Sequence, residues 1–502
     1  MDWKERALAL LKDSLEPVPS ELNEIDWKSG LSDKSDRLAQ HISAFANHLY
    51  GGILVYGVND DGSLFSLGKE QIEDIVKKLG NIAHNNLSNH IQIEHTVQEY
   101  NGENLLFIFI PEEQGKPVHL RGKDIYASYY RSGGQTLKMS TKQVQMLIAK
   151  SMGISFEENT ALDNLSQDQV LSLLDYQALY RILDKSVPKS ADTILDKLSD
   201  MGYCSEKNGS WTITNLGAIL FARSLSSFPS ISGREVVVRK YAGPNNRQLQ
   251  HEQRGGLGYA VGFEGLIDYI MMNTGNEVID TSRNIEPTYP RVAIREFVAN
   301  ALIHQDFAID GSPITIEIFS NRLVITNPGA PLNNINRLLD LPPRSRNEKL
   351  AQSMLLLNIC ERRGSGVDRA IEAVEKMFLP PVKFQMLDDY TKITLFPQKS
   401  LSEMTKREKI MACYQHACLM FEDNVAINNQ SIRERFGINK NQSYVASRIL
   451  ADAVEEKLIK PVDEESVSKK ILNLCSVLCV VLFAAIIIGM CKLLKVRYFL
   501  FA

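Results

Sequence analysis

The sequence lacks paired cysteines, an excess of positive charge, and repetitive or low-complexity segments. It has seven cysteines, and Cys204, Cys360, Cys413 and Cys418 form no C-x-x-C pair and have no histidine at ligand spacing. A structural zinc site is therefore not expected. With 56 Lys and Arg against 60 Asp and Glu, the net charge is −4. No global positive field attracts nucleic acid, so any such site must be a local patch, a metal-bridged contact or a shape match.

The N-terminus also lacks the apolar core of a signal peptide. Its first residues, MDWKERALALLKDSLEP, are charged and amphipathic, which favours a cytoplasmic body. A disulfide framework is not expected in a chain of 502 residues, which indicates a reducing compartment. This length predicts about three or four domains.

The pattern along the chain predicts a multi-domain protein of mixed class, α/β (α+β). We divide it into a mixed helix-and-strand domain (1–150), a helical, winged-helix-like middle domain (155–285), a domain with a strong helix, a strand pair and glycine loops (286–397), a winged helix-turn-helix (405–462) and an apolar run (471–491).

The first domain has clear signals for strands. ILVYGV (53–58) follows a Gly pair and reads as a short buried strand. Two apolar runs flank Asn101-Gly102, the favoured two-residue hairpin turn, and predict a hairpin. IYASYY (125–130) predicts a further strand.

Two blocks in this domain carry a family resemblance. They are ELNEIDWKSG (21–30) and AFANHLYGGILVYGVNDDG (44–62). In order and spacing they resemble the AlbA-like domain of Schlafen proteins and their prokaryotic relatives, over roughly residues 1–150.

The resemblance implies a metal site. In nuclease-active Schlafens, the matching acids hold a divalent metal, here Glu21, Asp26 and Asp60 (or Asp61). Clustered carboxylates suit magnesium, with manganese as the alternative, and the metal would activate water against a phosphodiester. Lys28 could offset charge on a phosphate oxygen. The alternative, which we favour, is a binding module without cleavage in which these acids are solvated.

Aromatic residues near the end of the domain allow two interpretations. Tyr126, Tyr129 and Tyr130 could stack on bases while Arg131 contacts phosphate. Ordinary strand packing is the interpretation that we prefer.

The strongest catalytic-looking feature is YPRVAIREFVANALIHQDF (289–307). Glu296, Asn300 and His304 are spaced four residues apart and lie on one stripe of a predicted helix. PITIEIFS and RLVITNPG then predict two antiparallel strands. Later, RRGSG places Gly364 and Gly366 ahead of another helix, where backbone N–H groups can hold phosphate.

These blocks resemble the GHKL ATPase fold, an α/β sandwich, in the divergent version that follows AlbA-like domains. The resemblance implies ATP with magnesium on Asn300, water activation by Glu296, and a phosphate loop at the RRGSG glycines. The loop after the strand, Asn327 to Gly329, would contact adenine, with Asn327 where the family has Asp. His304 is expected to be structural rather than a phosphate ligand.

The segment 427–463 has the rhythm of a helix-turn-helix. Gly437 lies at the turn and Ser431 can cap the first helix. Lys440 and Arg448 could contact DNA phosphates, whereas acidic neighbours such as Asp452 argue against strong DNA binding. Contact with DNA and contact with protein both remain open.

The apolar run 471–491 contains no charged residue. As a helix it would span about 31 Å, close to the roughly 30 Å apolar core of a bilayer. We therefore expect a C-terminal transmembrane helix, and a membrane-anchored protein with a cytoplasmic body.

The leading hypothesis is an ATP-binding, nucleic-acid-binding protein that acts as a nucleotide-dependent switch. The resemblance alone suggests transcriptional control or anti-phage defence. The alternatives are a metal-dependent endoribonuclease and a non-catalytic DNA-binding regulator, so ATPase and nuclease activity both stay open. Expected partners are DNA or RNA and a membrane, and assembly into a homo-oligomer is left open.

Overall fold

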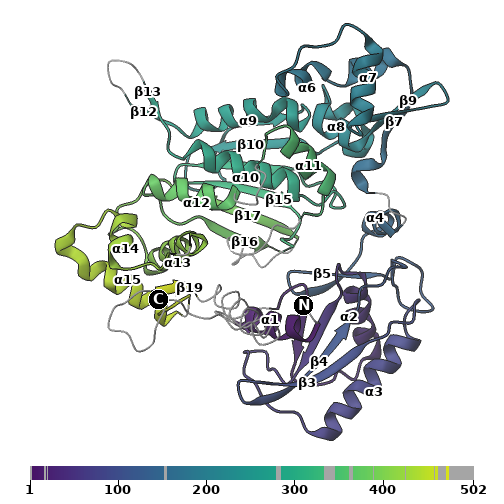
Figure 1. Ribbon diagram of the computed structural model, residues 1–502, viewed down its shortest axis with the longest axis vertical. Coiled ribbons are helices and arrows are strands. Elements are labelled where there is room, and N and C mark those ends of the chain that lie inside the picture. Colours follow the sequence, from purple (N-terminus) through teal and green to yellow (C-terminus); the bar gives the residue numbers. More distant parts are fainter. Residues whose placement is uncertain are drawn as a thin grey trace, which may run out of the picture.

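The structure, a computed structural model, describes residues 3–15, 19, 21–151, 155–278, 284–332, 345–360, 366–387, 389–423, 425–456, 458–461 and 471–473. Along the chain lie an N-terminal domain (3–151), a middle domain (155–231), a sheet domain (236–395) and a C-terminal winged helix (405–473), as Figure 1 shows.

The N-terminal domain is built on a four-stranded sheet in the order β1-β2-β4-β3, with β1 and β2 parallel and the other neighbours antiparallel. Its elements are α1 (Trp3–Leu15), β1 (Ile25–Lys28), α2 (Ser35–Asn47), β2 (Gly52–Tyr56), α3 (Lys69–Asn85), β3 (Glu94–Tyr100), β4 (Glu103–Ile110), β5 (Tyr129–Ser132), β6 (Gln135–Lys138) and α4 (Thr141–Ser151). Strands β5 and β6 form a separate hairpin.

Strand β2 is buried on both faces, which explains its uninterrupted apolar sequence. Successive side chains of a strand point to opposite faces. Ile53 and Val55 accordingly pack with α1, whereas Leu54 and Tyr56 pack with α2 and α3. The buried strand expected at 53–58 is confirmed, although it ends at Tyr56.

The hairpin of β3 and β4 turns at Asn101-Gly102, as expected. Both residues have positive φ, 51° for Asn101 and 85° for Gly102, which is the conformation of a two-residue turn that suits Asn-Gly. The strand expected at 125–130 begins later, at Tyr129.

The middle domain combines short helices with a three-stranded sheet in the order β7-β9-β8. Its elements are η1 (Phe156–Glu158), β7 (Thr160–Leu165), α5 (Gln167–Leu173), α6 (Tyr176–Ile182), α7 (Ala191–Asp200), β8 (Cys204–Lys207), β9 (Ser210–Thr214), α8 (Asn215–Phe221), η2 (Leu225–Ser227) and η3 (Pro229–Ile231). The hairpin of β8 and β9 follows α7, which is the position of the wing in a winged-helix domain. Thr214 ends the hairpin and caps α8, because its hydroxyl accepts from the N–H of Gly217 at 3.1 Å.

The sheet domain holds a six-stranded sheet in the order β11-β10-β14-β15-β17-β16. Its elements are β10 (Val236–Tyr241), β11 (Leu249–Gly255), α9 (Tyr259–Thr274), β12 (Asn276–Val278), β13 (Asn284–Glu286), α10 (Arg291–His304), β14 (Ile314–Phe319), β15 (Arg322–Pro328), α11 (Glu348–Leu356), α12 (Gly366–Lys376), β16 (Lys383–Leu387) and β17 (Tyr390–Leu395). Helices α9, α10 and α12 lie on one face of this sheet (Figure 1).

This sheet includes strands that precede the range 286–397. Strand β10 pairs in parallel with β14, with Val236 opposite Ile314, and β11 is the antiparallel neighbour of β10. The division expected near residue 286 therefore falls inside the domain, because no local pattern reveals which distant strands pair.

The winged helix comprises α13 (Lys406–Glu422), α14 (Asn429–Phe436), η5 (Lys440–Gln442), α15 (Ser443–Glu455), β18 (Ile459–Pro461) and β19 (Ile471–Asn473). Gly437 ends α14 with φ 63°, at the expected turn. Asn428 rather than Ser431 caps α14, because the Asn428 side chain accepts from the N–H groups of Gln430 and Ser431.

The expected transmembrane helix and the membrane localisation need correction. Ile471–Asn473 forms β19 and pairs with β18, so the apolar run begins as the return strand of a wing. Among the residues that the structure describes, no helix is both long enough and apolar enough to cross a bilayer. The rest of the run, 474–491, lies outside the described residues.

Candidate functional site

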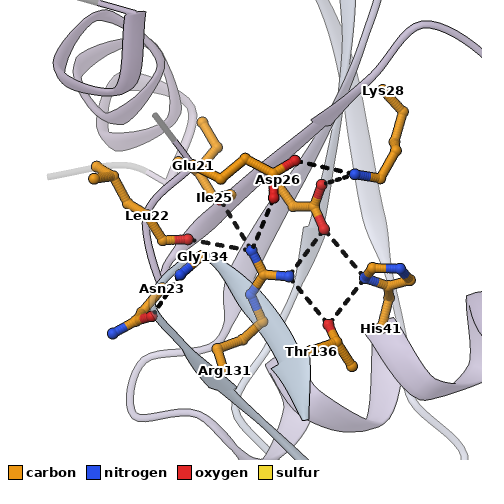
Figure 2. A network of polar contacts seen from close by, with 10 residues as sticks. All are labelled: Glu21, Leu22, Asn23, Ile25, Asp26, Lys28, His41, Arg131, Gly134 and Thr136. Carbon is orange, nitrogen blue, oxygen red and sulfur yellow. Dashed lines mark hydrogen bonds and ion pairs between the residues drawn. The ribbon is translucent and has the colours of Figure 1, made fainter. Parts of the chain in front are cut away.

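A polar cluster lies between β1 and the β5–β6 hairpin (Figure 2). Asp26 is fully buried, and its Oδ2 accepts a hydrogen bond from Arg131 Nη1 at 2.9 Å and lies 3.1 Å from His41 Nδ1. Its other oxygen, Oδ1, contacts the Lys28 ammonium. Lys28 also donates to Glu21 Oε1 at 3.0 Å. The cluster thus brings two acids, two permanent cations and a histidine together.

Arg131 is held on several sides. Besides Asp26, its guanidinium donates to Thr136 Oγ1 at 3.0 Å and to the carbonyl oxygens of Leu22 and Ile25 at 3.3 and 3.4 Å. Its side chain has no exposed area. Contact of Arg131 with a nucleic-acid phosphate was the less favoured of our two interpretations, and the buried guanidinium has no surface for a phosphate. Its role here is to fix β5 to β1.

The two carboxyl groups of the cluster have opposite pKa shifts. Burial alone would raise the pKa of Asp26, but the hydrogen bond from His41 and the charge of Arg131 outweigh burial and hold this pKa far below its usual range. Burial, followed by the proximity of Asp26, raises the pKa of Glu21 to about 7. Asp26 is therefore a fixed anion, whereas Glu21, which is partly exposed, exchanges its proton near neutral pH.

The expected third acid does not join them. Asp60 is exposed in the turn after β2, and the neighbouring Asp61 accepts from the N–H of Ser63 at 2.9 Å. Within the described ranges, no group of three or more His, Cys, Asp and Glu side chains could hold a metal ion. Cationic side chains already occupy both oxygens of Asp26, so the structure offers no support for magnesium or manganese at this cluster.

A second site lies at helix α10. Glu296 is buried, with 5% of its surface exposed, and Asn300 lies one turn later and is half-buried. Gly366, the first residue of α12, approaches Glu296 so closely that a Cβ at this position would stand 2.4 Å from Glu296 Oε2. Only glycine therefore leaves the carboxylate in place at the start of α12.

The end of β15 and the residue after it, Gly329, form the next part of this site. Asn327 is buried, and Gly329 has φ +117°, which favours glycine. The N–H of Gly329 donates to the carbonyl of Asp389, and the carbonyl of Gly329 accepts from Thr391 Oγ1 at 2.7 Å. A Cβ on Gly329 would collide with the guanidinium of Arg346. The loop is thus packed tightly on both sides.

His304 ends α10 and lies beside Arg346. Burial, and then the charge of Arg346, lower the pKa of His304 to about 4. The imidazole is therefore neutral at physiological pH and supplies no charge for a phosphate. Arg346 itself donates to the carbonyl of Ala330 at 2.6 Å. These contacts fit the structural role expected for His304.

The residues present fit a nucleotide with a divalent cation. A half-buried amide (Asn300) follows a buried carboxylate (Glu296) on one helix, and the start of α12 approaches this carboxylate so closely that a Cβ at Gly366 would displace its oxygen. Gly364 lies outside the described residues, so Gly366 is the part of the RRGSG loop that can be placed.

A contact between two domains was not expected from the sequence. The hydroxyl of Tyr130 donates to Asp389 Oδ2 at 3.0 Å, and the hydroxyl of Ser132 donates to Asp389 Oδ1. Lys142, at the start of α4, forms an ion pair with Asp310 of the sheet domain. Single polar residues on a short strand carry no motif, so sequence reasoning had no signal for this contact.

The winged helix exposes the start of α15. Lys440 and Arg448 are exposed, and Tyr444 between them has 69% of its surface exposed. Asp452, further along, pairs with Lys406 of α13 at 3.3 Å. Lys440 of η5 and Tyr444 and Arg448 of α15 are thus exposed to solvent. Further along α15, Lys406 neutralises part of the negative charge of Asp452.

The chain thus joins a mixed α/β domain with a charged cluster to a domain built on a six-stranded sheet and to a winged helix. Comparison with known families agrees. Residues 21–140 match the family Schlafen, AlbA_2, and residues 311–395 match the family described as "Putative ATP-dependent DNA helicase recG C-terminal". The matches support an AlbA-like domain at residues 21–140 and a RecG-like C-terminal ATPase domain at residues 311–395.

Two solved structures resemble this chain, one over nearly its whole length and one over a quarter of it. The DIP2311 protein from Corynebacterium diphtheriae is 15% identical with a TM-score of 0.40, covering 94% of this chain and 97% of that chain. The N-terminal domain of a RecG-related protein from Nitrosomonas europaea is 24% identical with a TM-score of 0.20, covering 25% of this chain and 86% of that one. Comparison with curated proteins finds no match. Likenesses this distant carry no functional argument.

Proposed function

We propose that this protein is a nucleotide-controlled switch that binds nucleic acid. In this proposal, magnesium-ATP binds the ATPase domain at α10 and changes how the AlbA-like domain presents its polar cluster. The observation that carries the proposal is the buried carboxylate of Glu296 pressed against Gly366, with Asn300 one helical turn away.

Each residue of the site has a distinct role. Bound magnesium-ATP supplies the cation, the negative charge and a cleavable phosphoanhydride bond. The amide oxygen of Asn300 binds the cation, and Glu296 orients water if the nucleotide is hydrolysed. The first N–H groups of α12, from Gly366 onward, donate to phosphate oxygens. The Asn327 amide accepts from the adenine amino group.

The polar cluster of the AlbA-like domain provides the nucleic-acid side of the switch. Lys28 is partly exposed, with 33% of its side chain accessible, and lies next to Glu21, the acid that titrates near pH 7. A phosphate that approaches Lys28 competes with Glu21 for the ammonium, and protonation of Glu21 then favours the phosphate. Binding without cleavage fits this arrangement, because the cations of the cluster stand where the metal was expected.

Isothermal titration with magnesium-ATP tests the proposal. We expect Asn300→Ala to abolish measurable binding, because it removes the amide oxygen that holds the cation. The matched control is Asn81→Ala, an exposed position on α3 in the other domain. Equal affinity of Asn300→Ala and the wild-type protein would remove the basis of the proposal.

A DNA-binding regulator that acts through residues 405–462 is a second candidate function. The exposed start of α15 favours this function. The ion pair of Lys406 with Asp452 also favours it, because it reduces the repulsion between Asp452 and DNA phosphates. We expect the double change of Lys440 and Arg448 to Ala to weaken duplex DNA binding and to flatten its salt dependence. The control is Arg407→Ala on the neighbouring helix. DNA affinity that survives the double change would exclude this candidate.

A further inference from the structure

The AlbA-like domain and the ATPase domain meet at strand β5 through one carboxylate. Asp389 lies just before β17 of the ATPase domain. Its two oxygens accept from Tyr130 (3.0 Å) and from Ser132, both on β5. Burial, and then the negative charge of Asp389, raise the pKa of Tyr130 to about 12, so its hydroxyl stays a donor at physiological pH. We call these three residues the Asp389 contact.

The Asp389 contact continues directly into the nucleotide loop. The backbone carbonyl of Asp389 accepts from the N–H of Gly329, and Thr391, two residues later, donates to the carbonyl of Gly329 at 2.7 Å. The nucleotide loop consists of Asn327 and Pro328, which end β15, and of Gly329, so with the start of β17 it forms one hydrogen-bonded unit. A ligand that displaces the Gly329 end of this unit also displaces the Asp389 carboxylate that β5 contacts.

On the other side, the Asp389 contact continues into the polar cluster. Successive residues of a strand point to opposite faces, so Tyr130 and Ser132 face the ATPase domain while Arg131 between them faces the interior of the AlbA-like domain. There Arg131 holds the buried Asp26 at 2.9 Å. The same short strand thus contacts Asp389 of the ATPase domain and Asp26 of the AlbA-like domain.

Strand β5 lies outside the four-stranded sheet, and among the described strands it pairs with β6. Its Tyr129 backbone is bound to α2, because the Tyr129 carbonyl accepts from Asn47 Nδ2 at 3.1 Å and the Tyr129 N–H donates to Ser43 Oγ at 3.3 Å. A second contact between the domains, the ion pair of Lys142 and Asp310, does not involve β5. Asp310 is held in turn by Arg234 at 3.2 Å. A shift of β5 therefore does not require the domains to separate.

We propose that β5 couples the two sites: the Asp389 contact transmits the position of the nucleotide loop to Arg131, and through Arg131 to the Asp26–Glu21–Lys28 cluster. This inference rests on the proposed function and names the residues that perform its regulation. Because coupling between two binding sites is reciprocal, nucleic acid must change the affinity for ATP by the same factor as ATP changes the affinity for nucleic acid.

The test compares the full chain with the double variant Tyr130→Phe/Ser132→Ala, which removes both hydroxyl donors and leaves the ring and the backbone. The affinity for a short single-stranded RNA and for duplex DNA is measured by fluorescence anisotropy, with and without saturating magnesium-ATP. The affinity for magnesium-ATP is measured by titration, with and without the same probes. Tyr126→Phe, at an exposed tyrosine of the same domain, is the matched control.

For the wild-type protein and Tyr126→Phe we expect a coupling factor of roughly 5- to 150-fold, the usual range for linked sites. For the double variant we expect a factor near one, while each ligand alone binds within about twofold of the wild type. Asp389→Asn is the second variant, should the double variant unfold. Its amide can still accept one hydrogen bond, so part of the coupling should remain.

The outcomes separate the two ideas. Undiminished coupling in the folded double variant, or in Asp389→Asn should the double variant unfold, overturns the role of β5 and leaves the proposed switch standing. A wild-type protein that binds magnesium-ATP and a probe without coupling refutes the switch and the role of β5 together. Failure of the wild-type protein to bind magnesium-ATP refutes the proposed function itself, and the role of β5 with it.

Discussion

Replacing Arg131 with Met should destabilise the AlbA-like domain strongly. The change preserves much of the side-chain volume but removes the charge that holds Asp26, an acid with no exposed area. Breaking a buried ion pair by removing one partner costs about 3–5 kcal/mol. His41 and Lys28 remain beside Asp26, so we expect the lower end, about 3 kcal/mol. At about 3–5 °C per kcal/mol for a domain of this size, Tm should fall by roughly 10 °C.

Intrinsic tryptophan fluorescence can follow this domain alone. The chain has three tryptophans, and Trp3 and Trp27 lie in the AlbA-like domain, whereas Trp211 lies in the middle domain. In a Trp211→Phe background the signal therefore reports only the domain of interest. Trp27 directly follows Asp26 and is 4% exposed, so it senses the loss of this cluster.

Arg37→Met is the matched control, because Arg37 is exposed on α2 of the same domain. An exposed change of this kind should stay within about 0.5 kcal/mol. The effect at Arg131 should also persist in 1 M salt, since a buried pair is screened far less than an exposed one. If both variants melt alike, or if salt removes the difference, Arg131 and Asp26 are not the buried pair described here.

Three further predictions follow from single positions. The pKa of Glu21 is raised from 4.5 to about 7 in the folded protein, so ionisation of Glu21 opposes folding. This penalty is absent below about pH 4.5 and complete above about pH 7, and it lowers Tm as the pH rises between these values. Glu21→Gln should remove the contribution of Glu21 to this fall in Tm. Gly366→Ala should displace Glu296 and weaken the binding of magnesium-ATP, measured by titration. The control Gly265→Ala, in open space on α9, should instead raise the free energy of unfolding by about 0.5–1 kcal/mol. Equal affinity of the two variants for magnesium-ATP would contradict the close approach of Gly366 to Glu296. Gly437→Ala should destabilise the winged helix by about 1 kcal/mol because of its φ of +63°, and a melting curve that does not change would rule out this cap.

Local sequence patterns were sufficient for several elements. The apolar run of β2 and the Asn-Gly turn after β3 each depend on a few neighbouring residues, and both form as expected. The strand pair β14–β15 and the turn at Gly437 are similar cases. In each, the physical cause lies within the segment itself, in backbone preference or in side-chain alternation.

Partners that are distant in the sequence could not be predicted. Nothing near Arg131 indicates that its guanidinium meets Asp26, and nothing near Tyr130 indicates Asp389 in another domain. The same limit explains the metal set, since the motif showed three acids but not the cations that surround Asp26. It also explains the C-terminal run, whose first residues pair with β18 although their composition suits a bilayer.

The parallel pairing of β10 with β14 decides where this protein can be divided. A fragment that begins at residue 286 would keep Asn300 but lose the neighbour of β14, exposing a bare strand edge that invites aggregation. Preparations of the ATPase domain should therefore begin ahead of Val236.

During synthesis the same pairing delays this sheet until β14 has emerged, whereas the sheet of the AlbA-like domain is complete once β4 is made. The N-terminal portion can thus reach its native state first and is already formed when its later neighbour folds against it.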